Sequence, residues 1–172
     1  MIVVAALVRA LVYATLFIGF FLVFLPARML DRSGIVAPPG TGPVEIVGIV
    51  VAALGALLAV SCILTFAIAG RGTPAPFDPP RRLVAIGPYR YVRNPMYIGA
   101  GFALLGAAIY YRSLVLVGYL VAFLVILALF VRWYEEPTLR RMFGKEYESY
   151  CANTPGWVPL RRRGAPPSMS GR

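Results

Sequence analysis

Long apolar runs alternate with short polar segments along this chain, and the polar segments carry most of the proline and arginine. A helix rises about 1.5 Å per residue, so roughly 17–25 apolar residues cross a hydrocarbon core of about 30 Å. Each run has such a length, the third at the lower limit. The pattern predicts an all-α polytopic membrane protein with four transmembrane helices, at Ile2–Leu25, Ile46–Ala69, Pro95–Tyr111 and Leu114–Val131.

The connections between these runs differ in length. Arg28–Pro43 is a polar loop with several proline and glycine breakers, whereas Gly72–Tyr91 is longer and proline-rich. A loop of about 20 residues without regular structure is uncommon in a compact protein and is more often functional or disordered. Arg112 and Ser113 form a tight turn, so we expect the third and fourth helices to make an antiparallel hairpin.

A stretch after the fourth run is amphipathic, with charged residues opposite an apolar and aromatic face. We expect a C-terminal helix that lies in the membrane interface. The domains expected are two N-terminal transmembrane helices over residues 1–70, a core over 71–160 and a basic, disordered tail over 161–172. The residues of the apolar face are Leu139, Met142, Phe143, Tyr147 and Tyr150.

Composition supports a membrane protein. Hydrophobic residues make up 59% of the chain and charged residues 14%, and the net charge is +10. The basic residues lie beside the apolar runs, which favours retention of loops in the cytoplasm over nucleic-acid binding. Their distribution predicts that both termini and the loop between the second and third helices are cytoplasmic. Only Lys145 is lysine among 17 basic residues, and alanine, glycine and proline are used heavily. This composition is typical of a GC-rich bacterial genome, so we expect a bacterial inner membrane.

The chain contains no histidine and only two cysteines, Cys62 and Cys151, which lack metal-ligand spacing. Histidine-based metal or acid–base chemistry is therefore excluded, and we expect no metal. Any chemistry must use arginine, acidic, tyrosine, asparagine or backbone groups.

The polar stretch Gly87–Tyr97 is a candidate anion site. Asn94 is a favoured N-cap residue and Pro95 suits the first position of a helix. Arg90 and Arg93 lie just before this helix, whose N-terminus attracts anions. The sequence thus predicts an anion-binding corner at the start of the third transmembrane helix.

A tight hairpin places this corner beside Glu135 and Glu136, at the end of the fourth helix. Arginines suit a carboxylate, whereas a glutamate pair suits an ammonium group or sugar hydroxyls. S-adenosylmethionine carries all of these groups, and Gly99 and Gly101 would let it approach the backbone. Each feature also has a structural interpretation: topology-setting arginines, carboxylates at a helix start, packing glycines and an aromatic belt.

The segments GPYRYVRNPMYIG and EEPTLRRMFGKEYESYCANTPGWVP resemble the membrane superfamily of isoprenylcysteine carboxyl methyltransferases and phospholipid methyltransferases. The resemblance covers about 83–159. It implies that an S-adenosylmethionine site is lined by Tyr91, Arg93, Asn94, Pro95 and Tyr97. It also implies that Gly99–Gly101 begins a cofactor-facing helix, and that Glu135 and Glu136 hold the cofactor. Asn94 stands where many members have histidine, so it can donate a hydrogen bond but cannot accept a proton.

The resemblance implies a methyltransferase that acts on a lipophilic acceptor entering from the bilayer. Without histidine, a carboxylate or thiol acceptor is favoured, because neither needs a general base at neutral pH. Arg132, on the same helical face as the glutamates, is the candidate catalytic residue that orients an acidic acceptor. The alternatives are a phospholipid amine N-methyltransferase, an NADPH-dependent membrane lipid reductase and a non-enzymatic membrane protein.

Overall fold

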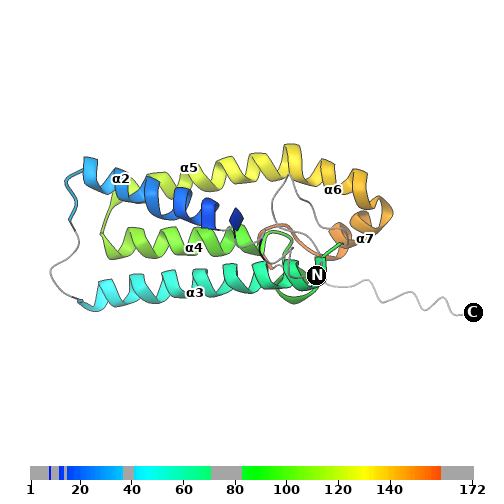
Figure 1. The fold of residues 1–172 in the computed structure, drawn as a ribbon, viewed down its shortest axis with the longest axis horizontal. Helices are drawn as coiled ribbons and strands as arrows, with labels where there is room; N and C mark the ends of the chain where they lie inside the picture. The colour runs from blue at the N-terminus through cyan, green and yellow to red at the C-terminus, as the bar shows by residue number, and fades with distance from the viewer. Residues whose placement is uncertain (1–7, 9–11, 14, 37–40, 71–82, 160–172) are drawn as a thin grey trace, which may run out of the picture.

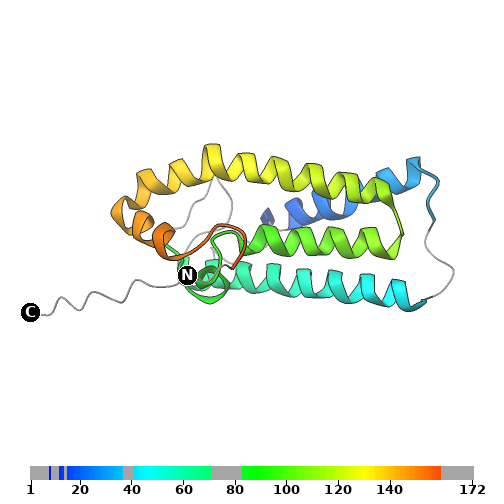
Figure 2. The ribbon, with the colours of Figure 1, turned by 180° about the vertical axis from the view of Figure 1, so that it is seen from behind.

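The computed structural model describes residues 8, 12–13, 15–36, 41–70 and 83–159, and this part of the chain is helical without strands. Long helices lie side by side along one axis, with α4 between α3 and α5 (Figure 1). The chain turns back at one end of this bundle through the short helices α6 and α7, as the reverse view also shows (Figure 2). The predicted all-α class is confirmed.

Two helices are long and apolar enough to cross a membrane. They are α3 (Pro43–Thr65), which continues as a π turn (η2, Phe66–Gly70), and the continuous helix Leu114–Phe143. Only 28% of the most apolar window of each helix is buried in the protein, so their remaining apolar surface needs a hydrophobic solvent. The third predicted run forms the shorter apolar helix α4 (Pro95–Tyr110).

Glycines bring α3 and α4 into backbone contact. A Cβ atom on Gly106 would lie 2.4 Å from the Ala52 nitrogen, and one on Gly99 would lie 2.8 Å from the Gly55 oxygen. No side chain fits at either position, and such close approach of helices is typical of membrane proteins. These contacts, which we call the α3–α4 crossing, therefore hold α4 closely against α3 along the length of α4.

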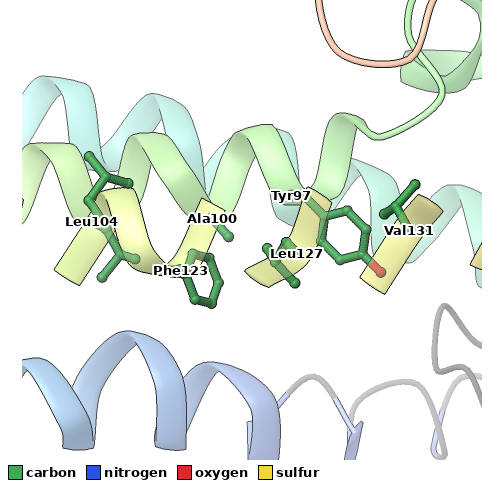
Figure 3. Close-up of a cluster of buried hydrophobic side chains, with 7 residues drawn as sticks. Tyr97, Ala100, Leu104, Phe123, Leu127 and Val131 are labelled. Atoms are coloured by element: carbon green, nitrogen blue, oxygen red, sulfur yellow. The ribbon is translucent and has the colours of Figure 1, made fainter. Parts of the chain in front are cut away.

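The other side of α4 packs against α5 (Leu114–Phe130) through a buried apolar cluster. On each of the two helices the side chains of this cluster recur every three or four positions, so they lie on one face (Figure 3). A tight turn joins them, since the Ser113 hydroxyl accepts a hydrogen bond from the Leu116 amide and caps α5. The predicted hairpin is confirmed. The labelled cluster residues are Tyr97, Ala100, Leu104, Phe123, Leu127 and Val131.

The first helical segment ends later than predicted. It runs through a π segment, η1 (Ile18–Phe24), into α2 (Leu25–Arg32), so Arg28–Arg32 is helical and not part of a loop. The helix continues past Pro26, which lies in the first turn of α2, and ends at Arg32, shortly before Gly34, which has a positive φ of 64°. Buried Leu30 packs against Ala108 and Leu116. Most of the predicted first span before Ile18 lies outside the described residues.

The end of the fourth predicted span also differs. The helix does not stop at Val131 but continues through a π turn, η4 (Val131–Glu135), into α6 (Glu136–Phe143). The predicted interfacial helix then breaks at Gly144, whose φ is 51°, and α7 (Lys145–Asn153) folds back over the end of the bundle (Figure 1). Tyr147 is consequently buried and not exposed to a membrane surface.

Candidate functional site

A small cavity lies at the end of the bundle where α3 ends, α4 begins and α6 and α7 fold back. Its volume is about 40 Å³. One part of its wall is apolar and the other carries an arginine, an asparagine, two glutamates and three tyrosines. The lining residues are Phe66, Leu83, Val84, Tyr89, Arg93, Asn94, Val131, Glu135, Glu136, Leu139, Tyr147 and Tyr150.

The chain enters this site through a short 3₁₀ turn, η3 (Gly87–Arg90). Gly87 has a φ of 59°, a conformation that glycine adopts without strain, and Pro88 suits the first position of the turn. The turn buries Tyr89 against Cys62 and Val84. Arg93 and Asn94 then reach the cavity immediately before α4.

The glutamate pair reaches the cavity from a widened helical turn. Pro137 has no N–H and its ring crowds the carbonyl four residues earlier, and the helix opens into the π turn Val131–Glu135 just ahead of it. A wider turn reduces the angle between successive side chains. Glu135 and Glu136, although adjacent in sequence, therefore both line the cavity.

Arg93 is the central cation of the site. Its Nη1 lies 2.9 Å from Glu136 Oε1 and donates to Cys151 Sγ at 2.8 Å, while its buried Nε has no partner among the described residues. Burial is the largest single effect and lowers the pKa of Arg93, but Glu136, Cys151 and Tyr147 together outweigh it, so the pKa of Arg93 lies above its usual value. Arg93 therefore remains a cation with donor capacity left over.

Glu135 is held by a neutral hydrogen-bond donor. The Tyr97 hydroxyl donates to Glu135 Oε2 at 2.8 Å, from α4 to the end of η4. Among the described residues Glu135 thus has a neutral phenol as its partner, whereas Glu136 has the cation of Arg93. The predicted meeting of the polar stretch and the glutamate pair is confirmed.

Helix α7 closes the site from the far side. The Tyr150 hydroxyl donates to the Tyr89 carbonyl oxygen at 2.6 Å, and Tyr147 lines the cavity beside Arg93. Burial raises the pKa of Tyr147 and of Tyr150, and also that of Tyr89. None of these three phenols is a base at neutral pH.

The remaining predicted site residues lie elsewhere. Arg90 and Tyr91 are exposed and stack on each other, with Arg90 Cζ 5.0 Å from the Tyr91 ring centroid. Arg132 is exposed on α5's extension and does not line the cavity. Pro95 is buried at the first turn of α4.

The two glycines face neighbouring helices. Gly99 lies against Gly55 and Ala59 of α3, and Gly101 lies beside Leu124 of α5. Their predicted contact with a cofactor finds no support in this geometry, because helix packing accounts for both.

Asn94 occupies the N-cap position, but its side chain makes no capping hydrogen bond. Its Nδ2 donates instead to the Gly156 carbonyl oxygen at 3.2 Å. The predicted side-chain cap is therefore wrong: the side-chain oxygen accepts no bond from the first turn of α4, and the side chain is held by a tertiary partner through Nδ2.

Several lining residues were not predicted. Tyr147 and Tyr150 lie three positions apart on one helical face, and this spacing was attributed to a membrane-facing stripe. Only the break at Gly144 directs them toward Arg93. Cys151, which contacts Arg93, gave no signal in the sequence.

Comparison with known proteins gives one match. The family model described as phospholipid methyltransferase matches residues 44–146, which include α3, α4, α5 and α6 together with Arg93, Glu135 and Glu136. Neither the curated proteins nor the solved structures gave a match.

Proposed function

The chain belongs to the phospholipid methyltransferase family, and we propose that it is an integral-membrane enzyme that methylates a lipophilic acceptor with S-adenosylmethionine. The observation that carries the proposal is the meeting of Arg93 with Glu135 and Glu136 at one cavity. These residues are about 40 positions apart, yet an ion pair and a tyrosine–carboxylate hydrogen bond join the two segments. A carboxylate-binding group and two ammonium-binding groups thus lie side by side.

The donor set fits this cofactor. Arg93 retains a buried Nε that has no partner in the described part of the chain and can donate to an anionic group. The two carboxylates can accept hydrogen bonds from an ammonium group or from ribose hydroxyls. When bound, S-adenosylmethionine supplies a methyl group on a sulfonium, open to direct displacement. The cavity of about 40 Å³ is smaller than the roughly 150 Å³ that admits benzene, so binding requires lining side chains to move apart.

The protein's own groups bind, orient and exclude water. Arg93 remains cationic near neutral pH, so it binds a carboxylate throughout that range. The tyrosines of α7 and η3 remain neutral donors and shield the cavity. With these roles, alignment in a dry site contributes to the rate and no covalent intermediate is needed.

For the acceptor we propose a carboxylate or a thiol on a lipophilic molecule. The chain has no histidine. Burial raises the pKa of each of the three cavity tyrosines, so they stay protonated at neutral pH and cannot accept a proton from the acceptor. A phospholipid amine is the second candidate, which the family description favours together with Glu135, a carboxylate whose partner is a neutral phenol. Glu135 would then take the proton of the ammonium before transfer.

Treatment with mild alkali distinguishes the methylated products of these acceptors. Membranes that contain the protein are given methyl-labelled S-adenosylmethionine, and the lipid extract is then treated with base. A methyl ester releases volatile labelled methanol, whereas a methylated amine or thioether retains its label. Retention of all label in an amine-containing headgroup would replace the first acceptor with the second.

We also propose four spans, with both termini and the cavity on the cytoplasmic side of a bacterial inner membrane. The basic residues beside the cavity end and their scarcity near the α4–α5 turn support this orientation. In a Cys62→Ala/Cys151→Ser background, Leu114→Cys should react with an impermeant thiol reagent from outside, and Ser149→Cys only after lysis. Leu114 is 85% exposed, which makes it a suitable reporter. The opposite pattern would invert the topology.

Saturable binding of labelled S-adenosylmethionine to detergent-purified protein tests the main proposal. Glu136→Gln should weaken binding because the ligand loses a carboxylate that accepts from its ammonium group or ribose hydroxyls. Glu146→Gln, an exposed glutamate on α7, is the matched control and should bind as the wild type does. Folded wild-type protein without saturable binding would refute the proposed function.

A further inference from the structure

The segment Thr154–Val158, which we name the C-terminal strap, follows α7 and lies beyond the residues that the family model matches. It is held along the polar stretch before α4. Its contacts advance in the same direction on both segments, from Pro155 with Arg93, through Gly156 with Asn94, to Trp157 with Tyr97. The strap thus follows the stretch that supplies the polar side of the cavity.

Backbone and side-chain hydrogen bonds attach the strap to the start of α4. The Arg93 amide donates to the Pro155 oxygen at 2.9 Å, and the Asn94 amide donates to the Gly156 oxygen at 3.1 Å. The Asn94 side chain donates to the same Gly156 oxygen at 3.2 Å. Asn94 is buried, so loss of this bond would leave its amide without a partner. These bonds set the register between strap and helix.

That register places Trp157 on Tyr97, which is hydrogen-bonded to Glu135, one of the two glutamates. The ring centroids of Trp157 and Tyr97 are 6.2 Å apart and the rings are nearly parallel, at 27°. Tyr97 is buried, and its hydroxyl donates to Glu135. Trp157 does not line the cavity, yet only Tyr97 separates it from a cavity carboxylate.

We propose that Trp157 is a positioning residue of the cofactor site and that Asn94 is the anchor of the strap that carries it. Trp157 sets the orientation of the Tyr97 ring, and the Tyr97 hydroxyl in turn sets the Glu135 carboxylate. The inference rests on the proposed function, because Glu135 is the group through which the strap would affect the ligand. It gives Asn94 a role that needs no proton transfer.

The first experiment is a double-mutant cycle on the full-length protein, read as affinity for S-adenosylmethionine. Trp157→Ala should weaken binding about 3- to 10-fold, the range of an aromatic pair, and Trp157→Phe should restore most of it. In a Tyr97→Phe background, which keeps the ring but removes the hydroxyl, Trp157→Ala should change affinity less than about twofold. A merely structural role predicts equal losses in both backgrounds, and that result would overturn the proposal.

The second experiment tests the anchor without the cofactor. The chain has two tryptophans, and Trp133 is 71% exposed and outside the cavity, so Trp133→Phe leaves Trp157 as the single fluorophore. In that background, Asn94→Asp removes the amide donor at constant size and should increase collisional quenching of Trp157. Unchanged quenching would show that Asn94 does not hold the strap.

The two proposals fail in different ways. Wild-type protein that is folded but does not bind S-adenosylmethionine overturns the proposed function. Wild-type protein that binds, together with Trp157→Ala protein that binds equally well, overturns only the role of the strap.

Discussion

The two ends of the helix bundle each carry an arginine–glutamate pair that joins segments far apart in sequence. At one end Arg93 lies 2.9 Å from Glu136, and at the other Arg112 Nη2 lies 2.8 Å from Glu45, with Arg112 Nε donating to the same oxygen at 3.0 Å. The chemical groups are the same. Their surroundings are not.

At the Arg112 end the pair is complete. The Glu45 side chain is 4% exposed and the Arg112 side chain 66%, so the cation remains in contact with solvent while it neutralises a buried carboxylate. Arg112 has a φ of 48°, the single positive φ of a non-glycine residue in the described chain, in the tight turn before α5. This pair fastens the beginning of α3 to the α4–α5 turn.

At the Arg93 end both side chains are partly buried, at 19% and 24%, and Arg93 has a second partner in Cys151 and an unpartnered Nε. A second carboxylate, Glu135, lies next to the pair and is bonded to a phenol. These groups line one cavity together with Tyr147 and Tyr150 of α7. The two pairs thus differ in what remains for a ligand. At the Arg93 end, hydrogen-bonding groups that the ion pair does not use lie at a cavity.

The largest effect should come from Arg93→Gln. It removes the cation, its bond to Glu136 and its bond to Cys151, so we expect affinity for S-adenosylmethionine to fall about 100-fold, as for the loss of hydrogen bonds to a charged group. Calorimetric titration of the purified protein measures this. A loss of the same size in Arg112→Gln would remove the distinction between the two ends.

Next in size is substitution at the α3–α4 crossing. Gly106→Ala places a Cβ 2.4 Å from the Ala52 backbone nitrogen, which cannot move independently, and should destabilise the fold by about 1–3 kcal/mol. Gly118→Ala on α5, with nothing within 4 Å, is the control and should leave the melting temperature unchanged or slightly higher.

Gly99→Ala extends this test to the cavity end of the crossing. Its Cβ would lie 2.8 Å from the Gly55 oxygen, and the start of α4 must shift in response. We expect Gly99→Ala to lower both thermal stability and cofactor affinity, whereas folded Gly106→Ala keeps its affinity. Equal affinity in both variants would mean that the crossing does not position the cavity.

A smaller effect is expected for Arg112→Gln. Glu45 stays buried without its cation, so the melting temperature in detergent should fall, while cofactor affinity stays within about twofold because the pair lies at the opposite end. Thermal unfolding and binding measured on the same preparation separate the two quantities. Weakened binding at unchanged stability would contradict the assignment of this pair to structure alone.

The smallest effect is in alkali. Burial raises the pKa of Tyr89, Tyr147 and Tyr150 above the unfolded value of about 10. In alkali the folded state therefore retains protons that the unfolded state has lost, so their contribution to stability is complete below about pH 10 and declines as the pH rises further. A pH titration of tyrosinate absorbance should show a late phase. A smaller late phase in Tyr150→Phe would assign part of it to the cavity, and an unaltered late phase would assign it elsewhere.

The sequence by itself determined the helical class and the meeting of the two site segments. Apolar runs of membrane-spanning length leave few alternatives to helices, because backbone groups in lipid must bond within their own segment. A connection of three residues between α4 and α5 makes the helices antiparallel neighbours, and so Arg93 and Glu136 meet. Both conclusions depend on local length and periodicity, which a sequence displays directly.

Only the tertiary structure decided which side chains face the cavity. Gly99 and Gly101 contact α3 and α5, and Asn94 donates to the strap instead of capping its helix. Tyr147 reaches Arg93 because Gly144 reverses the chain. In each case a contact with a distant part of the sequence competes with a local preference of similar strength, and tertiary packing decides which of the two forms. The sequence specifies the groups that each segment carries, and the fold specifies which of them remain available for a ligand.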